Sequence, residues 1–412
     1  MTETSRPSPV RGSIQAPPSK SVAQRAIAIA SMANGKSLII NPGDSDDVLA
    51  AIDVCQKLGA SVYQDGGLLH VTGGISPPRV PLICGESGLS IRMFAGIAST
   101  FSEEICMTGQ GSLMKRPMKA TADALQALGV QCATTRGKLP LFLKGPIKGG
   151  QVHIDCSQGS QVLTGILLAA PLAKNDLHLH VHHLTSKPYI DLTIDMMQKF
   201  GVEITCDAYH YFFISSGQTY QACTFQAEGD WSGAAFFLVA GAIAGEVAVD
   251  NLRMDSIQGD KRILEALKAS GALLSHGESG IRAEKGNLHA FSFDASDCPD
   301  LFPPLVALAA HCSGTSRIQG VHRLRSKESD RATSLTEVFS NMGVDIRVEQ
   351  DTMCIKGRKP GPARVHSHGD HRIAMAAAIS ALGGEGPVII AQAEAVNKSY
   401  PGFFDDLARI KK

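Results

Sequence analysis

The chain has 412 residues, and its 39 basic and 39 acidic side chains give a formal net charge of zero at pH 7. This length predicts two domains, and the neutral charge argues against a nucleic-acid partner. The longest apolar run, about Ala234 to Ala244, is shorter than the ~20 residues of a membrane span, so no membrane partner is expected. The ten cysteines show no C-x-x-C spacing. Together with the lack of an apolar secretory signal, this predicts reduced thiols and a cytoplasmic location.

A unit of about seventy residues recurs six times along the chain. In five copies a helix-like run ends in glycine and passes at once into a strand-like run. The sixth copy, Phe403 to Ile410, ends the chain before any such glycine. Each glycine is expected just after the last turn of its helix, where φ is positive. The five glycines are Gly59, Gly129, Gly201, Gly271 and Gly343.

Each copy also contains a second helix-like run that is rich in Ala, Ile and Leu. These runs are apolar nearly all round, so we expect buried helices. Their polar residues gather at the N-terminal end, where free N–H groups and the helix dipole favour a bound anion. The repeats therefore predict helix N-termini that converge on one anion-binding cleft. The runs begin at Ser19, Glu86, Ser157, Asp230, Asp300 and Asp370.

Six repeats divide naturally into two domains of three. The last repeat lacks its final strand, and a strand-like segment from Val10 to Pro17 remains at the N-terminus. We expect this segment to complete the sixth repeat. One domain would then hold residues 19–227 and the other residues 1–18 and 228–412. Two hinge crossings would join them near residues 17–18 and 228–229, where Pro or Gly is present.

A basic residue recurs in the loop before the other helix of five repeats: Arg116, Lys187, Lys261, Lys327 and Lys398. Four more cations stand near the starts of buried helices: Lys20, Arg25, Arg92 and Arg372. A basic cleft in a neutral protein suits a small substrate with several negative charges, which Arg clamps through phosphate or carboxylate. No G-x-x-x-x-G-K-[ST] motif is present, so a P-loop is excluded.

Seven motifs carry a family resemblance. They are PPSKSVAQR (17–25), GDSDDV (43–48), SQVLTGILLAAPLA (160–173), SKPYID (186–191), RSKESDR (325–331), GDHRIAM (369–375) and NKSYP (397–401). Over almost its whole length, and in the same order, the chain resembles the 5-enolpyruvylshikimate-3-phosphate synthases. The resemblance implies a two-domain, inside-out α/β barrel of six repeats. Its buried helices would be parallel, with their N-termini toward the interdomain cleft, as the repeats themselves predict.

The resemblance also implies a reaction of the shikimate pathway to aromatic amino acids. The enolpyruvyl group of phosphoenolpyruvate passes to the 5-hydroxyl of shikimate 3-phosphate through a tetrahedral intermediate, and phosphate is released. Neither a metal nor an organic cofactor is implied. The implied partners are the two small substrates, with glyphosate as an inhibitor, and we expect a monomer.

Residue roles follow from the same resemblance. Asp300 stands at the position of the base for the 5-hydroxyl, Glu328 at that of the proton donor to C3, and Lys20 bridges both substrates as the third catalytic residue. Phosphoenolpyruvate binding is implied for Lys20, Gly88, Arg92, Arg116, Gln161, Arg331, Arg372 and Lys398. Shikimate 3-phosphate binding is implied for Lys20, Ser21, Arg25, Gly159, Ser160, Gln161, Ser186, Tyr189, Asp300, Arg323 and Lys327.

The chain departs from the family pattern at a few of these positions. The family segment N-A-G-T-A-M-R is ESGLSIR here, so Glu86 replaces an amide and Leu89 replaces a threonine. A carboxylate there would repel phosphoenolpyruvate unless it turns away or pairs with a cation. Gly159 replaces a serine, although its N–H could still bind phosphate, and Arg323 replaces an asparagine. Glyphosate sensitivity is therefore left open.

Two other functions remain as alternatives. One is the related enolpyruvyl transferase that acts on UDP-N-acetylglucosamine, which SKPYID and GDHRIAM disfavour. The other is a catalytically silent relative that binds a phosphorylated ligand, although such a relative would be expected to lose some of the catalytic residues present here.

Two smaller features have structural interpretations. His178, His180 and His182 alternate along one strand, and an exposed strand face is favoured over a metal site because no acidic or Cys ligands accompany them. Asp46 or Asp47 is expected to cap the helix that follows.

Overall fold

The computed structural model describes residues 1–277 and 280–412. The chain divides into two compact units. Unit 1 comprises Met1–Pro17 and Glu228–Lys412, and unit 2 comprises Pro18–Ala227. The chain passes between the units after Pro17 and again after Ala227. No helix in the described ranges combines the length and the apolar character that a membrane crossing requires.

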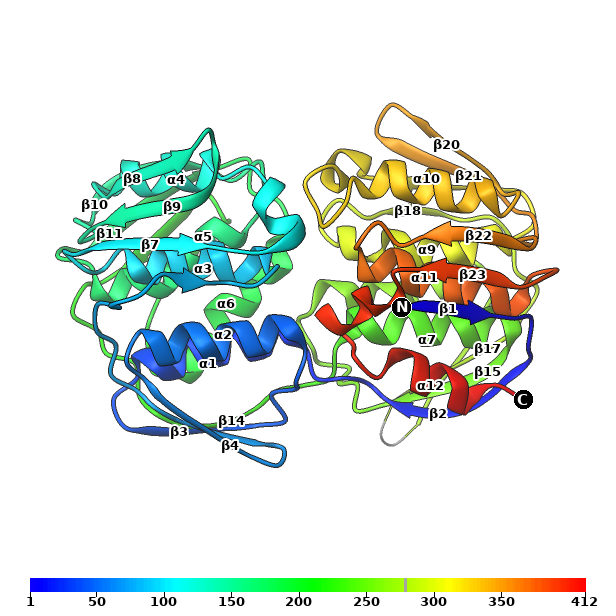
Figure 1. Cartoon of the computed structure of the whole chain (residues 1–412), viewed down its shortest axis with the longest axis horizontal. Helices are drawn as coiled ribbons and strands as arrows, with labels where there is room; N and C mark the ends of the chain where they lie inside the picture. The colour runs from blue at the N-terminus through cyan, green and yellow to red at the C-terminus, as the bar shows by residue number, and fades with distance from the viewer. Residues whose placement is uncertain (278–279) are drawn as a thin grey trace. The chain divides into compact units, whose positions relative to one another are not determined.

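Buried helices form the centre of each unit, as the repeats predict. Their small and aliphatic side chains leave no polar face, and in α7 every residue from Trp231 to Ile243 is buried. Sheets cover these helices, which confirms the α/β class and the inside-out arrangement (Figure 1). The buried helices are α1 (Lys20–Met32), α3 (Gly88–Ala98), α5 (Gln161–Ala169), α7 (Trp231–Ala244), α9 (Phe302–Ala310) and α11 (His371–Ser380).

The second helix of each repeat is amphipathic and partly exposed. These helices are α2 (Asp46–Lys57), α4 (Lys119–Ala127), α6 (Lys187–Lys199), α8 (Ile263–Ala269), α10 (Arg331–Asn341) and α12 (Phe403–Ile410). The glycine after each of the first five has φ between +80° and +102°, as predicted. A side chain at such a φ is strained, so glycine is the residue that ends these helices most easily.

Short 3₁₀ helices join several elements: η1 (Gly111–Lys115), η2 (Ala170–Leu172), η3 (Gly259–Arg262), η4 (Pro299–Leu301), η5 (Val321–Leu324), η6 (Ala381–Gly383) and η7 (Ala393–Lys398).

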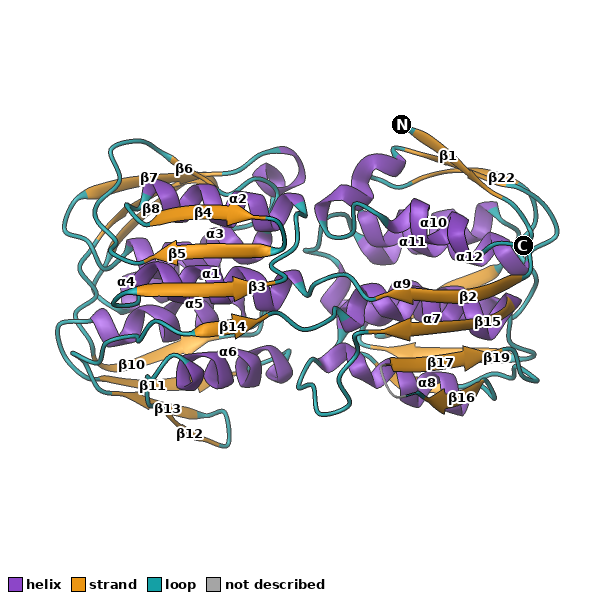
Figure 2. Cartoon of the chain, turned by 90° about the horizontal axis from the view of Figure 1, so that it is seen from below, coloured by secondary structure: helices purple, strands orange, loops and turns teal. Residues whose placement is uncertain are grey.

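The described strands form six sheets, one for each repeat. In the four-stranded sheets the first two strands are parallel, and the other two form an antiparallel hairpin at the edge. Figure 2 shows the first sheet of unit 2 in front of the helices of that unit. The sheets of unit 2 are, in strand order, β14 (Thr224–Gln226), β3 (Lys36–Ile40), β5 (Leu68–Thr72), β4 (Ser61–Asp65); β6 (Leu82–Ile83), β7 (Glu104–Thr108), β9 (Lys138–Lys144), β8 (Gln131–Thr135); and β10 (Gly150–Asp155), β11 (Leu177–His182), β13 (Tyr211–Ile214), β12 (Thr205–Asp207).

Unit 1 repeats this design twice and ends with a three-stranded sheet. Its sheets are β2 (Val10–Gln15), β15 (Gly245–Asp250), β17 (Gly280–Glu284), β16 (Leu273–His276); β18 (Ser292–Asp294), β19 (Thr315–Gln319), β21 (Thr352–Lys356), β20 (Asp345–Glu349); and β22 (Ala363–His366), β23 (Val388–Ala391), β1 (Thr2–Ser5).

The predicted role of the segment from Val10 to Pro17 is wrong. Its strand β2 pairs in parallel with β15 and completes the fourth repeat. By its place in the chain, just before α7, β14 would be the first strand of the fourth sheet. It pairs instead with β3 of the first repeat, so β2 takes the first position in the fourth sheet. The sixth repeat is completed by β1, which pairs antiparallel with β23. The segment TETS of β1 is polar and has one buried residue. It therefore lacks the alternation of apolar and polar residues by which a strand is recognised in a sequence.

Each unit has its own hydrophobic core. In unit 2, α3 and α5 approach so closely that a Cβ on Gly96 would lie 2.2 Å from the carbonyl oxygen of Gly165. The reciprocal contact is also tight, because a Cβ on Gly165 would lie 2.5 Å from the oxygen of Arg92. This packing brings the first turns of the two helices together.

Candidate active site

The N-terminal turns of α1, α3 and α5 contact one another through polar side chains. Gln24 of α1 accepts hydrogen bonds from the hydroxyls of Ser87 and Ser90 at 3.0 and 2.8 Å. Arg92 of α3 donates to Oε1 of Gln161 on α5 at 3.1 Å. The predicted convergence of polar helix starts is therefore present within unit 2.

Arg25 is a buried cation with neutral partners. Its guanidinium donates to the hydroxyl of Thr193 at 3.0 Å and to the carbonyl of Ser21 at 2.7 Å. Weaker bonds reach Thr164 and the carbonyl of Tyr189, both at 3.3 Å. Burial lowers the pKa of Arg25 to about 10. Because a buried charge without a counterion is costly, this position favours a bound anion.

Arg92 and Arg116 surround Gly88. Arg92 donates to the carbonyls of Gly88 at 2.9 Å and Pro117 at 3.3 Å. Arg116 is 9% exposed and packs directly on Gly88, where a Cβ would lie 2.2 Å from Nη1. Nε of Arg116 has no hydrogen-bond partner within the described ranges. A guanidinium buried in this way, beside a helix N-terminus, suits a phosphate or carboxylate group.

Lys20 pairs with Asp47, its Nζ lying 2.7 Å from Oδ2, and the two side chains are 11% and 5% exposed. The prediction that Asp46 or Asp47 caps α2 is wrong, because Ser45 occupies the N-cap position. Asp47 lies in the first turn of the helix and neutralises the lysine instead.

Glu86 turns toward η1, where Oε2 accepts from the backbone N–H of Ser112 at 2.9 Å and from its hydroxyl at 2.5 Å. Leu89, the other departure in this segment, is 8% exposed and belongs to the core.

The turn before α5 differs from expectation at Gly159. Its N–H donates to the carbonyl of Cys156 at 3.0 Å, whereas the sequence suggested that this group could serve a phosphate. Phosphate binding at Gly159 stays a prediction. Ser160 is 4% exposed and Ser186 is 5% exposed. Ser186 adopts φ +59° at the start of α6. This conformation is uncommon for serine and often marks a functional position.

Asp300 is the centre of a cluster in unit 1. Its Oδ1 lies 2.6 Å from Nη1 of Arg331 and 3.2 Å from Nζ of Lys327, and its Oδ2 lies 2.9 Å from Nη2 of Arg372. Burial raises the pKa of Asp300, but Arg372, Lys327 and Arg331 outweigh this effect and hold the pKa well below its usual value. Asp300 is therefore ionised at neutral pH.

Arg331 connects this aspartate with two further carboxylates. Its Nη2 lies 2.5 Å from Oε2 of Glu328, and its Nε lies 2.7 Å from Oδ2 of Asp370. Burial opposes the charge of Arg331, yet Asp370, Glu328 and Asp300 raise its pKa above the usual value. Lys398 lies 3.9 Å from Oε1 of Glu328. The cluster thus holds seven charged side chains, each 2.5–3.9 Å from at least one other member: Asp300, Lys327, Glu328, Arg331, Asp370, Arg372 and Lys398.

Similarity to known proteins identifies the family of this chain. The family model for EPSP synthase (3-phosphoshikimate 1-carboxyvinyltransferase) matches residues 4–407. The chain belongs to the EPSP synthase family. The 3-phosphoshikimate 1-carboxyvinyltransferase of Thermococcus kodakarensis is 40% identical over 97% of this chain and 98% of its own length. That of Methanocorpusculum labreanum is 38% identical over 98% and 97%. An EPSP synthase structure from Acinetobacter baumannii has a TM-score of 0.85 at 28% identity, covering 100% of this chain and 98% of the other.

In this EPSP synthase-family chain the predicted residues fall into two groups, one in each unit. Unit 2 carries Lys20, Ser21, Arg25, Gly88, Arg92, Arg116, Gly159, Ser160, Gln161, Ser186 and Tyr189, and unit 1 carries Asp300, Arg323, Lys327, Glu328, Arg331, Arg372 and Lys398. Arg323 lies on η5, 8% exposed, with Nη1 3.5 Å from the carbonyl of Ser296. Lys261, which belongs to the recurrent basic series, donates instead to the carbonyls of Met254 and Ser256 at 3.0 and 2.7 Å.

Sequence reasoning missed several acidic members of these groups. The sequence predicts a capping role for Asp46 or Asp47, and it marks Asp370 only as the start of a helix. Asp260 lay unnoticed beside Lys261, although it is 1% exposed and accepts from the hydroxyl of Ser232. Burial, followed by repulsion from Asp300, raises the pKa of Asp260 to about 7. For Asp260 and Asp370, the signal that could have found them is an acid next to basic residues, in QGDKR and GDHRIAM. The motif of Asp47, GDSDDV, has no basic residue and carries no such signal.

The three alternating histidines lie on one face of β11, as predicted, with His182 exposed. Within residues 1–277 and 280–412, no group of three or more possible ligands is placed to hold a metal.

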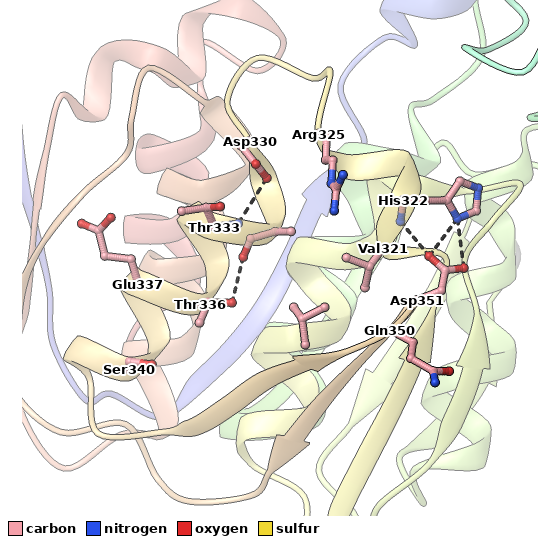
Figure 3. Close-up of a pocket in the computed structure, with 12 residues that line it drawn as sticks. Val321, His322, Arg325, Asp330, Thr333, Thr336, Glu337, Ser340, Gln350 and Asp351 are labelled. Carbon is pink, nitrogen blue, oxygen red and sulfur yellow. Dashed lines mark hydrogen bonds and ion pairs between the residues drawn. The ribbon is translucent and has the colours of Figure 1, made fainter.

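A cavity of about 750 Å³ opens in unit 1 between α10 and the hairpin of β20 and β21 (Figure 3). It is lined mainly by polar side chains, including His322, which bonds to Asp351 at 2.8 Å. None of the predicted catalytic or substrate-binding residues lines this cavity, so the cavity gives no information about the reaction.

Proposed function

We propose that this chain transfers the enolpyruvyl group of phosphoenolpyruvate to the 5-hydroxyl of shikimate 3-phosphate and releases phosphate. Family membership supports the reaction. The observation that carries the proposal for the residues is the position of Asp300, an ionised carboxylate 2.6–3.2 Å from three cations. Acid, base and anion-binding groups are thereby available in one cluster.

Asp300 is proposed as the base. In the structure its three cationic neighbours make it a weak base. Phosphate and carboxylate groups of the substrates compete for Lys327, Arg331 and Arg372. As those cations turn to the substrates, the pKa of Asp300 rises, because its stabilising charges are withdrawn. The carboxylate can then accept the proton of the 5-hydroxyl while that oxygen bonds to C2 of phosphoenolpyruvate.

Glu328 is proposed as the acid that protonates C3. The approach of an anionic substrate raises the pKa of this carboxyl and favours its protonated form. Addition of the proton to C3 and of the hydroxyl oxygen to C2 gives the tetrahedral intermediate. Elimination then removes a proton from C3 and breaks the bond between C2 and the phosphate oxygen, which leaves the enolpyruvyl ether and free phosphate.

Substrate binding is proposed for the residues that the family resemblance indicates. Arg92, Arg116, Arg331, Arg372 and Lys398 would hold phosphoenolpyruvate, together with Lys20, Gly88 and Gln161. Shikimate 3-phosphate would be held by Arg25, Ser160, Ser186 and Lys327, with the other residues that the family resemblance indicates. The buried Arg25 and Arg116 support these roles, since each has a charge that an anion would compensate.

We also propose that units 1 and 2 are the two three-repeat domains of the family, and that the protein acts in the cytoplasm. All ten cysteines are free thiols, which supports a reducing compartment.

The deciding experiment measures inorganic phosphate after mixing the protein with both substrates, and repeats the measurement with glyphosate. Release that requires both substrates is expected. Binding of shikimate 3-phosphate without any release would indicate a silent relative instead.

Two variants test the assigned roles. Asp300→Asn and Glu328→Gln should each lower kcat by about 10²–10⁴-fold, since each removes one proton-transfer group. Asp345→Asn, an exposed change on β20, is the matched control and should keep the wild-type rate. Near-normal turnover in either site variant would refute the role of that residue.

A further inference from the structure

We infer that Glu86 is a positioning residue that fixes the turn η1 and thereby holds Arg116 over Gly88. The inference rests on the proposed function, in which Arg116 binds phosphoenolpyruvate. It explains why a carboxylate is tolerated at a position beside an anionic substrate.

The carboxylate of Glu86 binds to η1. Oε2 accepts two hydrogen bonds from Ser112, one from the backbone N–H at 2.9 Å and one from the hydroxyl at 2.5 Å. The contact extends to Gly111, where a Cβ would lie 2.1 Å from Oε1 of Glu86. Gly111 has φ +51°, which favours glycine, and the nearby carboxylate of Glu86 leaves no room for a Cβ.

The turn is tied to the start of α3 at further points. The N–H of Gln110 donates to the carbonyl of Gly85 at 2.7 Å, immediately before Glu86. Leu113 is fully buried between these anchors and Arg116, and its carbonyl accepts from the N–H of Arg116 at 3.1 Å. Movement of Ser112 would therefore be transmitted to Arg116 through one turn of 3₁₀ helix.

The position of Arg116 depends on this turn. Nε has no partner within the described residues, and the guanidinium lies directly on Gly88, where a Cβ would lie 2.2 Å from Nη1 and 2.8 Å from Cζ. Because the guanidinium packs on backbone, and Nε donates to no group in the described residues, the position of Arg116 depends on its own main chain. That main chain is what Glu86 fixes.

Kinetics distinguish positioning from repulsion. Glu86→Ala should raise the KM for phosphoenolpyruvate by about 10–100-fold, the effect expected for hydrogen bonds to a charged group, with a smaller change in kcat. Glu86→Gln retains an acceptor for the N–H of Ser112 and should recover most of the loss. The KM for shikimate 3-phosphate should stay within about twofold, since this substrate is assigned to other residues. Glu104→Ala, an exposed change on β7, is the matched control.

A double-mutant cycle tests whether Glu86 acts through Arg116. If it does, Glu86→Ala should add almost nothing to the KM increase of Arg116→Ala, whereas independent effects would multiply. Hydrogen exchange should also show faster exchange at Ser112 in Glu86→Ala than in the wild type, without a change in the core of α3. Multiplying effects, or unchanged exchange at Ser112, would overturn the inference.

Wild-type activity separates failure of this inference from failure of the proposed function. If the wild type releases phosphate but Glu86→Ala and Glu86→Gln lower the KM for phosphoenolpyruvate, Glu86 repels the substrate and the positioning role is wrong. If the wild type releases no phosphate, the proposed function fails, and the exchange rate at Ser112 still decides whether Glu86 fixes the turn.

Discussion

Individual charges in this protein are arranged so that carboxylates and guanidinia compensate one another in unit 1 but not fully in unit 2. Among the described residues, Arg331 contacts three carboxylates, whereas the hydrogen-bond partners of Arg25 are neutral oxygens. A carboxylate that is paired with a cation can take part in proton transfer once a substrate displaces that cation. A buried charge that lacks a counterion is ready for an anion. The two kinds of residue therefore suit different tasks in the proposed reaction.

Asp260 should make the stability of the fold depend on pH. Its pKa of about 7 lies above the value of about 3.9 expected in the unfolded chain. A proton bound by the folded state stabilises it at low pH, so this contribution is fully present below about pH 4 and is lost as pH rises to about 7. Burial is the largest cause of this raised pKa, and Asp300 and Asp230 raise it further, whereas Arg372 and the hydrogen bond from Ser232 lower it.

The variant Asp260→Asn should remove this dependence. Its unfolding free energy, relative to the wild type, should improve by a few kcal/mol between pH 5 and pH 8, because the wild type must bury a charge at the higher pH. Urea unfolding at the two pH values measures the difference. Asp345→Asn should follow the wild type. An equal difference at pH 5 and pH 8 would show that Asp260 titrates normally.

At the scale of elements, the repeated helices determine where the polar groups lie. Arg92 of α3 and Gln161 of α5 bond to each other where the two helices pack backbone against backbone, at Gly96 and Gly165. The pattern of apolar residues predicted that these helices are buried, but it gave no reason for glycine at these two positions. A hydrophobic pattern does not distinguish a buried alanine from a buried glycine. The distance between the two helices, however, leaves room for glycine and not for the Cβ of alanine.

Gly96→Ala should therefore destabilise unit 2 by about 3 kcal/mol, the upper range for overpacking, since the opposing atom is a backbone oxygen that cannot move aside. It should also raise the KM for phosphoenolpyruvate, because Arg92 and Gln161 would separate. Chemical unfolding and steady-state kinetics measure the two effects. Gly67→Ala, where a Cβ meets nothing within 4 Å, should stay within about 0.5 kcal/mol of the wild type. Equal stability of the two variants would contradict the close approach.

At the scale of the whole molecule, the chain has two hydrophobic cores, and the residues of each belong to one unit. Because neither core shares its buried side chains with the other, each unit should respond separately to a change in its own core. Two-state unfolding of the full chain is not expected.

Phe339→Ala in unit 1 and Phe200→Ala in unit 2 form a reciprocal pair. Each removes a fully buried ring and should lower the stability of its own unit by about 3–5 kcal/mol. Native-state hydrogen exchange should then increase in the strands of the altered unit and remain unchanged in the core strands of the other. Equal acceleration in both units would show that they unfold together.

The sequence by itself determined the six repeats, the buried helices and the glycines that end the second helices, because each depends on local periodicity or on backbone conformation. It also indicated most of the proposed site residues through linked motifs, whose roles remain to be tested. Tertiary structure alone decided the strand exchange of β2 and β14, the place of β1, and the partners of Asp47, Glu86 and Asp260. Strand pairing and charge pairing join residues far apart in the chain, and a local pattern shows that a strand or a charge needs a partner without showing which partner it finds.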